Sequence, residues 1–349
     1  MSDFAAAAPP VPQSSCDSSA GLSFVCGAEN PEDLTLIPGT SWLLASGFSP
    51  GAGLKLVETR SGAMLSWYAA APEQIRPDKA RFAKCASPPD PKVFSAHGLS
   101  LRPAGGGRFT LYVINHGGRE SVEVFTIDPR AERPVLAWNG CLPLPAGLAG
   151  NSVAAFSDGT VLVTVLTRPG TTLADFVQGR NTGAVYAWGP RDAGFRLLPG
   201  TQLPGNNGLE TSPDDRRFYV VAFGWHAVLT FDRRDTRHPV ARAVAPDFMP
   251  DNIHWSGDGL LAAGMRYDEP ACGGPRKVID GVADPMLCHR GYVVAELDPA
   301  TGVYRTLAYA EPNPAFNSVS SAVMVDRELW LGSYRSDRLA HRPLPGRSP

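Results

Sequence analysis

The sequence predicts an all-β protein, a six-bladed β-propeller whose four-stranded blades surround a central calcium-binding tunnel. Three observations predict the fold. Short apolar segments are bounded by many glycines (36) and prolines (33). Helical periodicity is nearly absent. A pattern of a polar turn followed by two strands recurs at roughly 45–55 residues, the scale of one propeller blade.

The strand-like segments are rich in β-branched and aromatic residues and are bounded by turn residues. Clear examples are 109–116, 121–128, 160–167, 217–224 and 259–266. Hydrophobic residues make up 43% of the chain, so a sizeable core can form. Two segments are expected to be helical excursions from the sheets: 73–84, which Pro77 interrupts, and 171–178.

The repeat opens on a polar residue in each copy. These residues are Glu32, His97, Asn151, Asn207, Asn252 and Ser318, which predicts six blades. A β-sandwich with irregular loops is the alternative, but it does not explain why each copy opens on a polar residue.

The chain is expected to form one domain. We interpret residues 1–15 as a disordered tail and 16–349 as the propeller. The segment 268–290 has the character of a loop inserted near the tunnel mouth. It is either a lid or specificity element or a surface loop without function.

Charge and cysteine content limit the partners and the compartment. The net charge is −2 and no basic stripe is present, so a nucleic-acid partner is not expected. The six cysteines form no CxxC pair, which disfavours zinc. They are either buried thiols or disulfides; Cys272 and Cys288 flank a loop that a disulfide would close. Disulfides favour a periplasmic or secreted location over the cytoplasm. The sequence leaves the oligomeric state open.

The polar residues that open the repeats suggest a metal site. The first strand of each propeller blade lines the channel, so residues at equivalent positions converge. The candidates are two carboxylates and three amides: Glu32, Asp251, Asn151, Asn207 and Asn252. Such a set of oxygen donors suits Ca²⁺ better than Mg²⁺ or Zn²⁺. Any one of them could instead be a turn residue, but the repeat position and the adjacent Asp251–Asn252 pair favour ligands.

Several strings in the chain resemble a known family. They include FSAHGLSL (94–101), LYVINHGGRESVEVFTID (111–128), NNGLETSPD (206–214) and PDNIHW (250–255). In this order they resemble the paraoxonase/arylesterase family, within the gluconolactonase-like propeller superfamily. The resemblance extends from about residue 26 to residue 340.

The resemblance implies two ions. A catalytic calcium would be held by the same five residues that the repeat selects. A second, structural ion would use Asp33, the backbone carbonyl of Leu99 and position 152. The family has an aspartate at that position and this chain has Ser152, so the second site lacks one carboxylate.

The resemblance also implies a histidine pair. His97 is expected to act as general base on a water molecule and His116 to orient it. Alternatively, the metal activates the water itself, or both histidines only form hydrogen bonds. His254, which lies in a strand-like segment, is expected to be a packing residue.

The chain departs from the family in two respects. The family's disulfide between the N-terminal region and the last strand has no counterpart, because His341 lies near the second position. Ring closure is then left to strand pairing or to other cysteines. The family's amphipathic membrane helices also have no counterpart, so no membrane anchor is expected.

The expected function is calcium-dependent hydrolysis of lactones or aryl esters, with a small-molecule substrate as the partner. Asn151 and Asn207 would also donate to the developing oxyanion. One alternative is a sugar-lactone hydrolase or a non-hydrolytic, strictosidine synthase-like enzyme. Another is a calcium-stabilised binding propeller without catalysis. A serine hydrolase is disfavoured because Ser318, Ser320 and Ser321 do not lie in a GxSxG motif.

Overall fold

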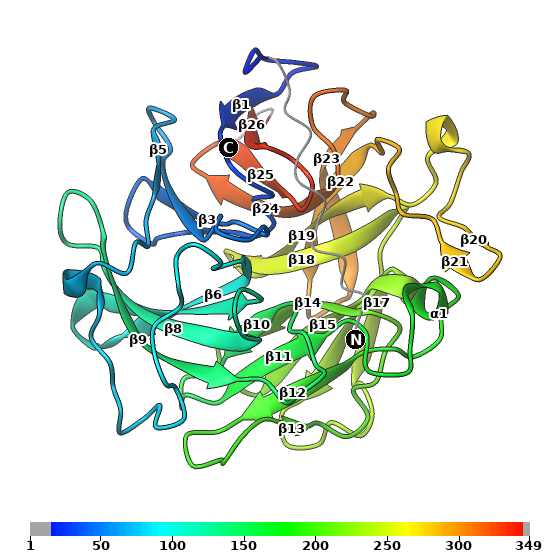
Figure 1. The fold of residues 1–349 in the computed structure, drawn as a ribbon. Coiled ribbons are helices and arrows are strands. Elements are labelled where there is room, and N and C mark those ends of the chain that lie inside the picture. Colours follow the sequence, from blue (N-terminus) through cyan, green and yellow to red (C-terminus); the bar gives the residue numbers. More distant parts are fainter. Residues whose placement is uncertain (1–14, 345–349) are drawn as a thin grey trace.

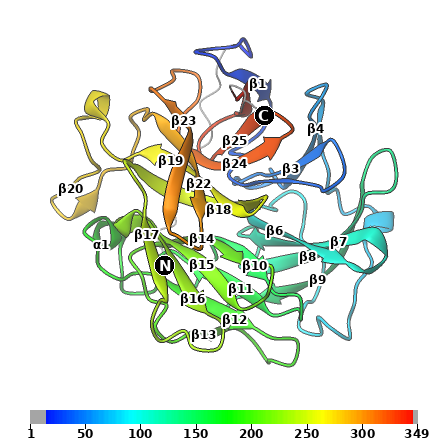
Figure 2. The ribbon, with the colours of Figure 1, turned by 180° about the vertical axis from the view of Figure 1, so that it is seen from behind.

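The structure is a computed structural model that describes residues 15–344. The expected tail at residues 1–15 lies almost wholly outside this range. Six four-stranded antiparallel sheets form a ring, which confirms the predicted six-bladed propeller (Figure 1; Figure 2 shows it from behind). The innermost strands, among them β6, β10, β14, β18 and β24, surround the centre of the ring in Figure 1.

The first three blades follow the chain from the innermost strand outward. Blade 1 consists of β2 (Leu34–Leu36), β3 (Trp42–Ser46), β4 (Leu54–Glu58) and β5 (Met64–Ser66). Blade 2 consists of β6 (Ala96–Ala104), β7 (Arg108–Asn115), β8 (Ser121–Asp128) and β9 (Val135–Pro143). Blade 3 consists of β10 (Val153–Ala155), β11 (Val161–Val165), β12 (Ala184–Trp188) and β13 (Arg196–Leu197).

The other three blades include one excursion and the closure of the ring. Blade 4 consists of β14 (Asn206–Thr211), β15 (Arg217–Ala222), β16 (Ala227–Asp232) and β17 (Ala241–Val244). Blade 5 consists of β18 (Phe248–Ser256), β19 (Gly259–Arg266), β22 (Tyr292–Asp298) and β23 (Val303–Ala310). Blade 6 consists of β24 (Val319–Val325), β25 (Glu328–Ser333), β26 (Arg338–Pro343) and the N-terminal β1 (Ser23–Cys26).

A buried apolar layer fills the space between each pair of neighbouring blades. Strand β15 shows how the sequence builds two of these layers at once. Phe218 and Val220 pack against blade 3, whereas Tyr219 and Val221 pack against blade 5. Successive side chains of a strand point to opposite faces, so a blade buried on both sides is apolar at consecutive positions.

The ring is closed by strand pairing, which is one of the two ways of closure expected from the sequence. β1 pairs with β26 over four residues of each strand. The six cysteines form three disulfides: Cys16–Cys26 at the start of the described chain, Cys85–Cys141, and Cys272–Cys288. The loop between Cys272 and Cys288 is therefore closed by a disulfide, as its flanking cysteines suggested.

The two expected helices have different outcomes. The α-helix α1 (Leu173–Val177) lies within 171–178 and begins with a capping box between Thr172 and Asp175. The expectation of a helix over 73–84 is wrong, because only the 3-10 helix η1 (Pro72–Gln74) forms there. Beyond it, Arg76 and Asp78 donate backbone hydrogen bonds to the edge strand β9. No helix within residues 15–344 has the length and apolar character needed to cross a membrane.

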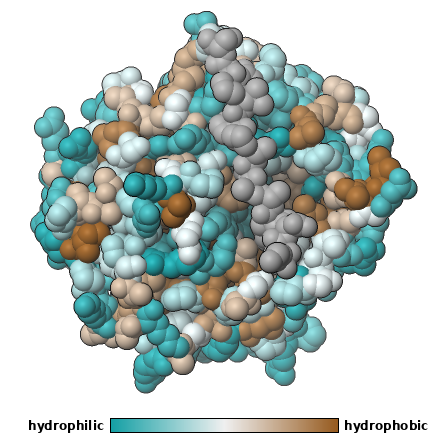
Figure 3. Space-filling view, viewed as in Figure 1, coloured by the Kyte–Doolittle hydropathy of each residue, from teal (hydrophilic) through white to brown (hydrophobic). Residues whose placement is uncertain are grey.

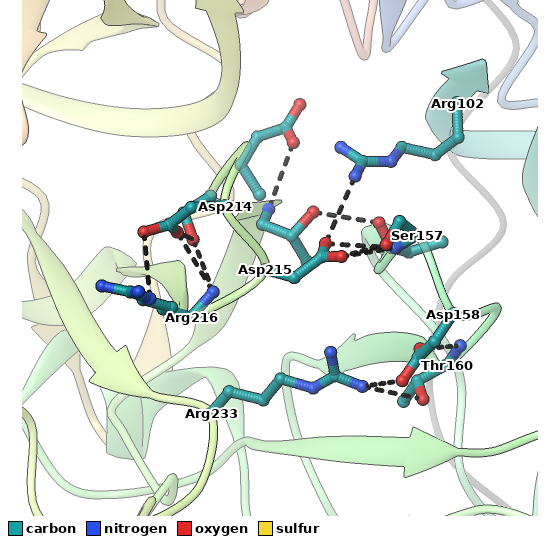
Figure 4. A network of polar contacts seen from close by, with 12 residues as sticks. Arg102, Ser157, Asp158, Thr160, Asp214, Asp215, Arg216 and Arg233 are labelled. Carbon is teal, nitrogen blue, oxygen red and sulfur yellow. Dashed lines mark hydrogen bonds and ion pairs between the residues drawn. The ribbon is translucent and has the colours of Figure 1, made fainter.

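A polar network links blades 2, 3 and 4 near the C-terminal ends of their innermost strands (Figure 4). Asp215, in the β14–β15 turn, accepts a hydrogen bond from the Ser157 backbone (3.1 Å) and lies 3.5 Å from the Arg102 guanidinium. Arg233 pairs with Asp158 of the neighbouring blade. These contacts hold the blades together at the end of the ring opposite to the residues described next.

Candidate calcium site at the centre of the ring

Four of the predicted site residues lie at irregularities of the innermost strands. The regular pairing of these strands is interrupted at 96–99 in β6, 206–209 in β14, 250–253 in β18 and 319–321 in β24. His97, Asn207 and the Asp251–Asn252 pair lie inside these interruptions. A bulge removes residues from the ladder and re-aims their side chains. Here it releases polar side chains for contacts across blades.

Side chains from four blades meet at this end of the ring. The Asn252 amide donates to Glu32 Oε1 at 2.7 Å, which links blades 5 and 1. The Asn207 amide donates to Asp251 Oδ1 at 2.6 Å, which links blades 4 and 5. His97 Nε2 of blade 2 lies 3.5 Å from Glu32 Oε2. The structure therefore brings together four of the five predicted ligands through direct contacts.

Asn151 is joined to the group through the backbone of blade 2. The Gly98 N–H donates to the Asn151 carbonyl at 3.2 Å. A Cβ at Gly98 would lie 2.6 Å from that oxygen, and one at Gly208 would lie 2.5 Å from the Asp251 carbonyl. Glycine therefore follows His97 and Asn207 because the next innermost strand approaches too closely for a side chain.

Three buried oxygens of this group have no hydrogen-bond partner among the described residues: Glu32 Oε2, Asn151 Oδ1 and Asn207 Oδ1. Buried polar atoms are nearly always paired, so three unpaired oxygens on neighbouring strands need an explanation. A bound cation that prefers oxygen ligands would give all three oxygens a partner. The described residues contain no group of three or more His, Cys, Asp or Glu side chains that could hold a metal. The candidate set instead combines two carboxylates with amide oxygens, which suits calcium.

The pKa shifts of the two carboxylates, Glu32 and Asp251, also favour a bound cation. Burial raises the pKa of Glu32 well above its usual range, and the nearby Asp33 raises it further. Burial also raises the pKa of Asp251, with Glu32 as the next cause. Two buried carboxylates that disfavour each other's ionisation are stabilised as anions by a bound cation.

The two predicted histidines form a hydrogen-bonded pair. His97 Nδ1 lies 2.9 Å from His116 Nε2. His116 Nδ1 lies 2.9 Å from Glu120 Oε1. The Phe48 ring stacks on His97, with ring centroids 4.1 Å apart. Burial lowers the pKa of His97 to about 4 and also lowers the pKa of His116. Both imidazoles are therefore neutral near pH 7.

The residues of the expected second ion make other contacts. Asp33 Oδ1 lies 2.6 Å from His254 Nε2, and Asp33 Oδ2 accepts the Leu99 N–H at 2.8 Å. The Ser152 N–H donates to the Thr164 hydroxyl. The Asp33 carboxylate therefore already has a partner for each oxygen, and one of its partners is an imidazole.

His254 is not a packing residue, and that expectation is wrong. Its other nitrogen, Nδ1, lies 3.2 Å from Glu210 Oε1, so it bridges two carboxylates. Burial alone lowers the pKa of His254, but Asp33 and Glu210 outweigh burial and raise the pKa well above its usual range. A cationic imidazole thus lies at the position where the resemblance implied a second ion.

The segment 268–290 leaves blade 5 between β19 and β22, at the end of β19 nearest the site. It contains η4 (Pro270–Cys272) and the short hairpin of β20 (Val278–Ile279) and β21 (Val282–Ala283). Met286 packs in a buried cluster with Phe176 of α1 and Met265 of β19. Ile279 and Val282 of this hairpin are among the most exposed hydrophobic residues. Figure 3 shows hydrophobic surface at its right edge, where Figure 1 places β20 and β21.

Sequence reasoning missed two neighbours of the histidine pair. Phe48 follows β3 and Glu120 lies in the β7–β8 loop, and neither occupies a repeated position. The only sequence signal for Glu120 is its spacing of four residues from His116, which has no meaning until the loop geometry is known.

Comparisons with known proteins support the fold. The luciferin-regenerating enzyme superposes with a TM-score of 0.52 at 13% identity and covers 92% of both chains. Regucalcin from Agrobacterium tumefaciens strain C58, described as a calcium-binding protein, gives a TM-score of 0.52 at 13% identity, covering 94% of this chain and 96% of that chain. At this level of identity the similarity shows the fold alone.

The sequence comparisons do not identify the family. No protein-family model matches the chain. A 92-residue stretch is 36% identical to a bifunctional protein of tRNA 5-methylaminomethyl-2-thiouridine biosynthesis from Maricaulis maris. That stretch makes up 26% of this chain and only 15% of the length of that protein.

Proposed function

We propose that the protein is a calcium-dependent hydrolase of lactones or aryl esters, similar to the paraoxonase/arylesterase family. The observation that carries the proposal is the set of three unpaired buried oxygens on Glu32, Asn151 and Asn207. With Asp251 and Asn252 they would hold one calcium ion. A calcium ion bound there supplies Lewis-acid polarisation of an ester carbonyl.

The residues of the chain have separate roles in this reaction. His97 takes a proton from the attacking water, which a buried neutral imidazole can do near pH 7. His116 holds the ring of His97 through the 2.9 Å contact. Phe48 covers one face of His97 and restricts its rotation. These contacts leave Nε2 of His97 as the nitrogen that faces Glu32.

The two asparagines assigned as oxyanion donors differ in their availability. The Asn207 amide uses one of its two protons on Asp251. Its remaining proton, and the amide of Asn151, are the donors that would stabilise the negative charge of the tetrahedral intermediate. The buried surroundings of both amides strengthen such hydrogen bonds.

We infer one calcium ion per chain. Both oxygens of Asp33 are engaged by His254 and Leu99, and Ser152 offers no carboxylate. A calcium ion at that position would have to displace an imidazole that already links two acidic side chains. These residues do not fit a second calcium ion.

Hydrolysis of phenyl acetate and of simple five- and six-membered lactones tests the proposal. Activity should disappear after EDTA treatment and return with calcium, and His97→Gln should lower kcat while the protein still binds calcium. Full activity in metal-free protein, or no turnover of any ester or lactone, would contradict the proposal.

The second candidate is a calcium-stabilised propeller without catalysis. The unpaired oxygens favour this candidate as much as the hydrolase, because they indicate binding of the ion and not turnover. It predicts the same thermal stabilisation by calcium without hydrolysis of either substrate class. The His97–His116 pair favours the enzyme, since a purely structural site has no need of a neutral imidazole beside it.

Compartment and partners complete the proposal. Three disulfides support an oxidising compartment, such as the periplasm or the exterior of the cell. The partner we propose is a small-molecule ester or lactone.

A further inference from the structure

Glu120 lies in the five-residue loop that joins β7 to β8, outside the set of residues that the repeat or the resemblance selects. We propose that Glu120 is a positioning residue. Through His116 it fixes His97 in the tautomer whose Nε2 carries no proton and faces Glu32. The catalytic consequence of this proposal rests on the function proposed above. The assignment of the tautomer does not depend on that function.

The direction of the hydrogen bonds in the series Glu120–His116–His97 follows from Glu120, because a carboxylate can only accept. Both oxygens of Glu120 lie close to His116 Nδ1, at 2.9 and 3.0 Å. An ionised carboxylate has no proton to give, so Nδ1 of His116 must carry one. In a neutral ring, Nε2 of His116 is then an acceptor. It lies 2.9 Å from His97 Nδ1, which must donate, so His97 Nε2 is left unprotonated.

The reverse direction has weaker support. It would require a proton on His97 Nε2, directed towards Glu32 Oε2. That separation is 3.5 Å, and Glu32 Oε2 forms no hydrogen bond within the described residues. It would also leave His116 Nδ1 as an acceptor opposite the Glu120 carboxylate, which is repulsive. The two shorter contacts at the Glu120 end therefore determine the tautomers.

The loop holds Glu120 in place. The His116 N–H donates to the Ser95 carbonyl at 3.0 Å, and the Asn115 side chain accepts the Gly117 N–H at 2.8 Å. The neighbouring Arg119 pairs with the buried Glu123. That arginine therefore does not compete with His116 for the Glu120 carboxylate.

The tautomer decides whether His97 can act as a base. With Nε2 unprotonated, it accepts a proton from the attacking water as the new C–O bond forms. The same proton then passes to the leaving oxygen as the ester C–O bond breaks, so His97 ends neutral in its original tautomer. With the other tautomer no lone pair on His97 would face the site.

The first test reads the ring nitrogens directly. In a long-range ¹H–¹⁵N spectrum of the calcium-loaded protein labelled with ¹⁵N-histidine, at pH 7.5, His97 and His116 should both be protonated at Nδ1. Glu120→Ala should shift both rings towards the Nε2-protonated form. The matched control is Glu328→Ala, because Glu328 lies 3.0 Å from Nδ1 of His341, a half-buried histidine in the outer part of blade 6. It should change the His341 signals only.

The second test measures turnover. Glu120→Ala should lower kcat for phenyl acetate by about 10- to 100-fold with little change in KM, as for other residues that orient a functional histidine. Glu120→Asp, which keeps the carboxylate, should recover most of the loss, and Glu328→Ala should leave kcat unchanged.

The outcomes separate this inference from the proposed function. If the wild type hydrolyses no ester or lactone, the proposed function fails and the spectrum alone decides the tautomer. Nε2-protonated His97 in the wild type overturns the inference. Unchanged kcat for Glu120→Ala in an active enzyme also overturns it.

Discussion

Replacing Asp251 by asparagine should change stability in opposite directions with and without calcium. Asp251 is buried, and its pKa is raised by burial and by Glu32. In calcium-free protein the substitution removes one of two mutually repelling charges, while the new side-chain oxygen can still accept from Asn207. The melting temperature without calcium should therefore rise. With calcium it should fall, because a charged ligand is lost.

The size of the calcium effect follows from mass action. Calcium at about 100 times its Kd should stabilise the wild type by about 2.7 kcal/mol, if it binds the folded state only. For a chain of 349 residues, the entropy of unfolding is about 0.7 kcal/mol/K. The expected gain in melting temperature is therefore about 4 °C, and Asp251→Asn should lose most of it.

The sign of the pH dependence can be derived for the calcium-free protein. The raised pKa values of Glu32 and Asp251 mean that the folded state keeps protons that the unfolded chain has already released. Stability should therefore fall as pH rises from about 4 through the raised values. Calcium competes with these protons, so the gain in melting temperature on adding calcium should grow with pH.

Differential scanning calorimetry in EDTA and in excess calcium measures both effects. Glu123→Gln is the matched control, because Glu123 is also a buried carboxylate but is paired with Arg119. It should destabilise the protein by about 1–3 kcal/mol whether or not calcium is present. The reasoning is refuted if Asp251→Asn lowers the melting temperature equally in both conditions, or if calcium does not stabilise the wild type.

Three further predictions concern stoichiometry and packing. Isothermal titration should give one calcium per chain, and a second tight site would show that Asp33 can exchange His254 for an ion. Gly98→Ala should destabilise the protein by about 1–3 kcal/mol and weaken calcium binding in the same titration. Gly105→Ala, where a Cβ would meet nothing within 4 Å, should do neither. Cys272→Ser should make the segment 268–290 sensitive to limited proteolysis while the calcium-dependent gain in melting temperature stays; a segment that remains resistant would show that packing alone holds it.

The fold and the five candidate ligands could be predicted because both depend on local patterns that repeat. Each blade requires apolar residues on both faces of its strands, and a polar residue that does not enter the apolar layers lies just before or within the first half of each innermost strand. The glycine after His97 and after Asn207 belongs to the same pattern, since the next strand passes within contact distance at both points.

The contacts of His254 could not be predicted in this way. Alternation along β18 separates His254 from Ile253 and Trp255, which pack between blades 4 and 5. The sequence does not show that Asp33 is its partner, because the two residues are 221 positions apart. Closure of the ring brings them together. The helix expected over 73–84 was wrong for a similar reason, since the backbone N–H groups of Arg76 and Asp78 pair with β9, a strand distant in the sequence.

The candidate calcium site also lies at the seam of the ring. Glu32 precedes the first strand of blade 1, and its carbonyl accepts a hydrogen bond from Ser320 of blade 6 at 2.6 Å. Next to it, the Pro31 carbonyl accepts the Ser333 N–H at 2.7 Å. Blades 1, 3, 4 and 5 supply the five candidate ligands, so one ion would join four blades close to this seam. Because β1–β26 pairing closes the ring only at the outer edge of blade 6, calcium should stabilise the inner edge of the seam. Hydrogen exchange should therefore slow most in β2 and β24 when calcium is added, and less in the outer strands.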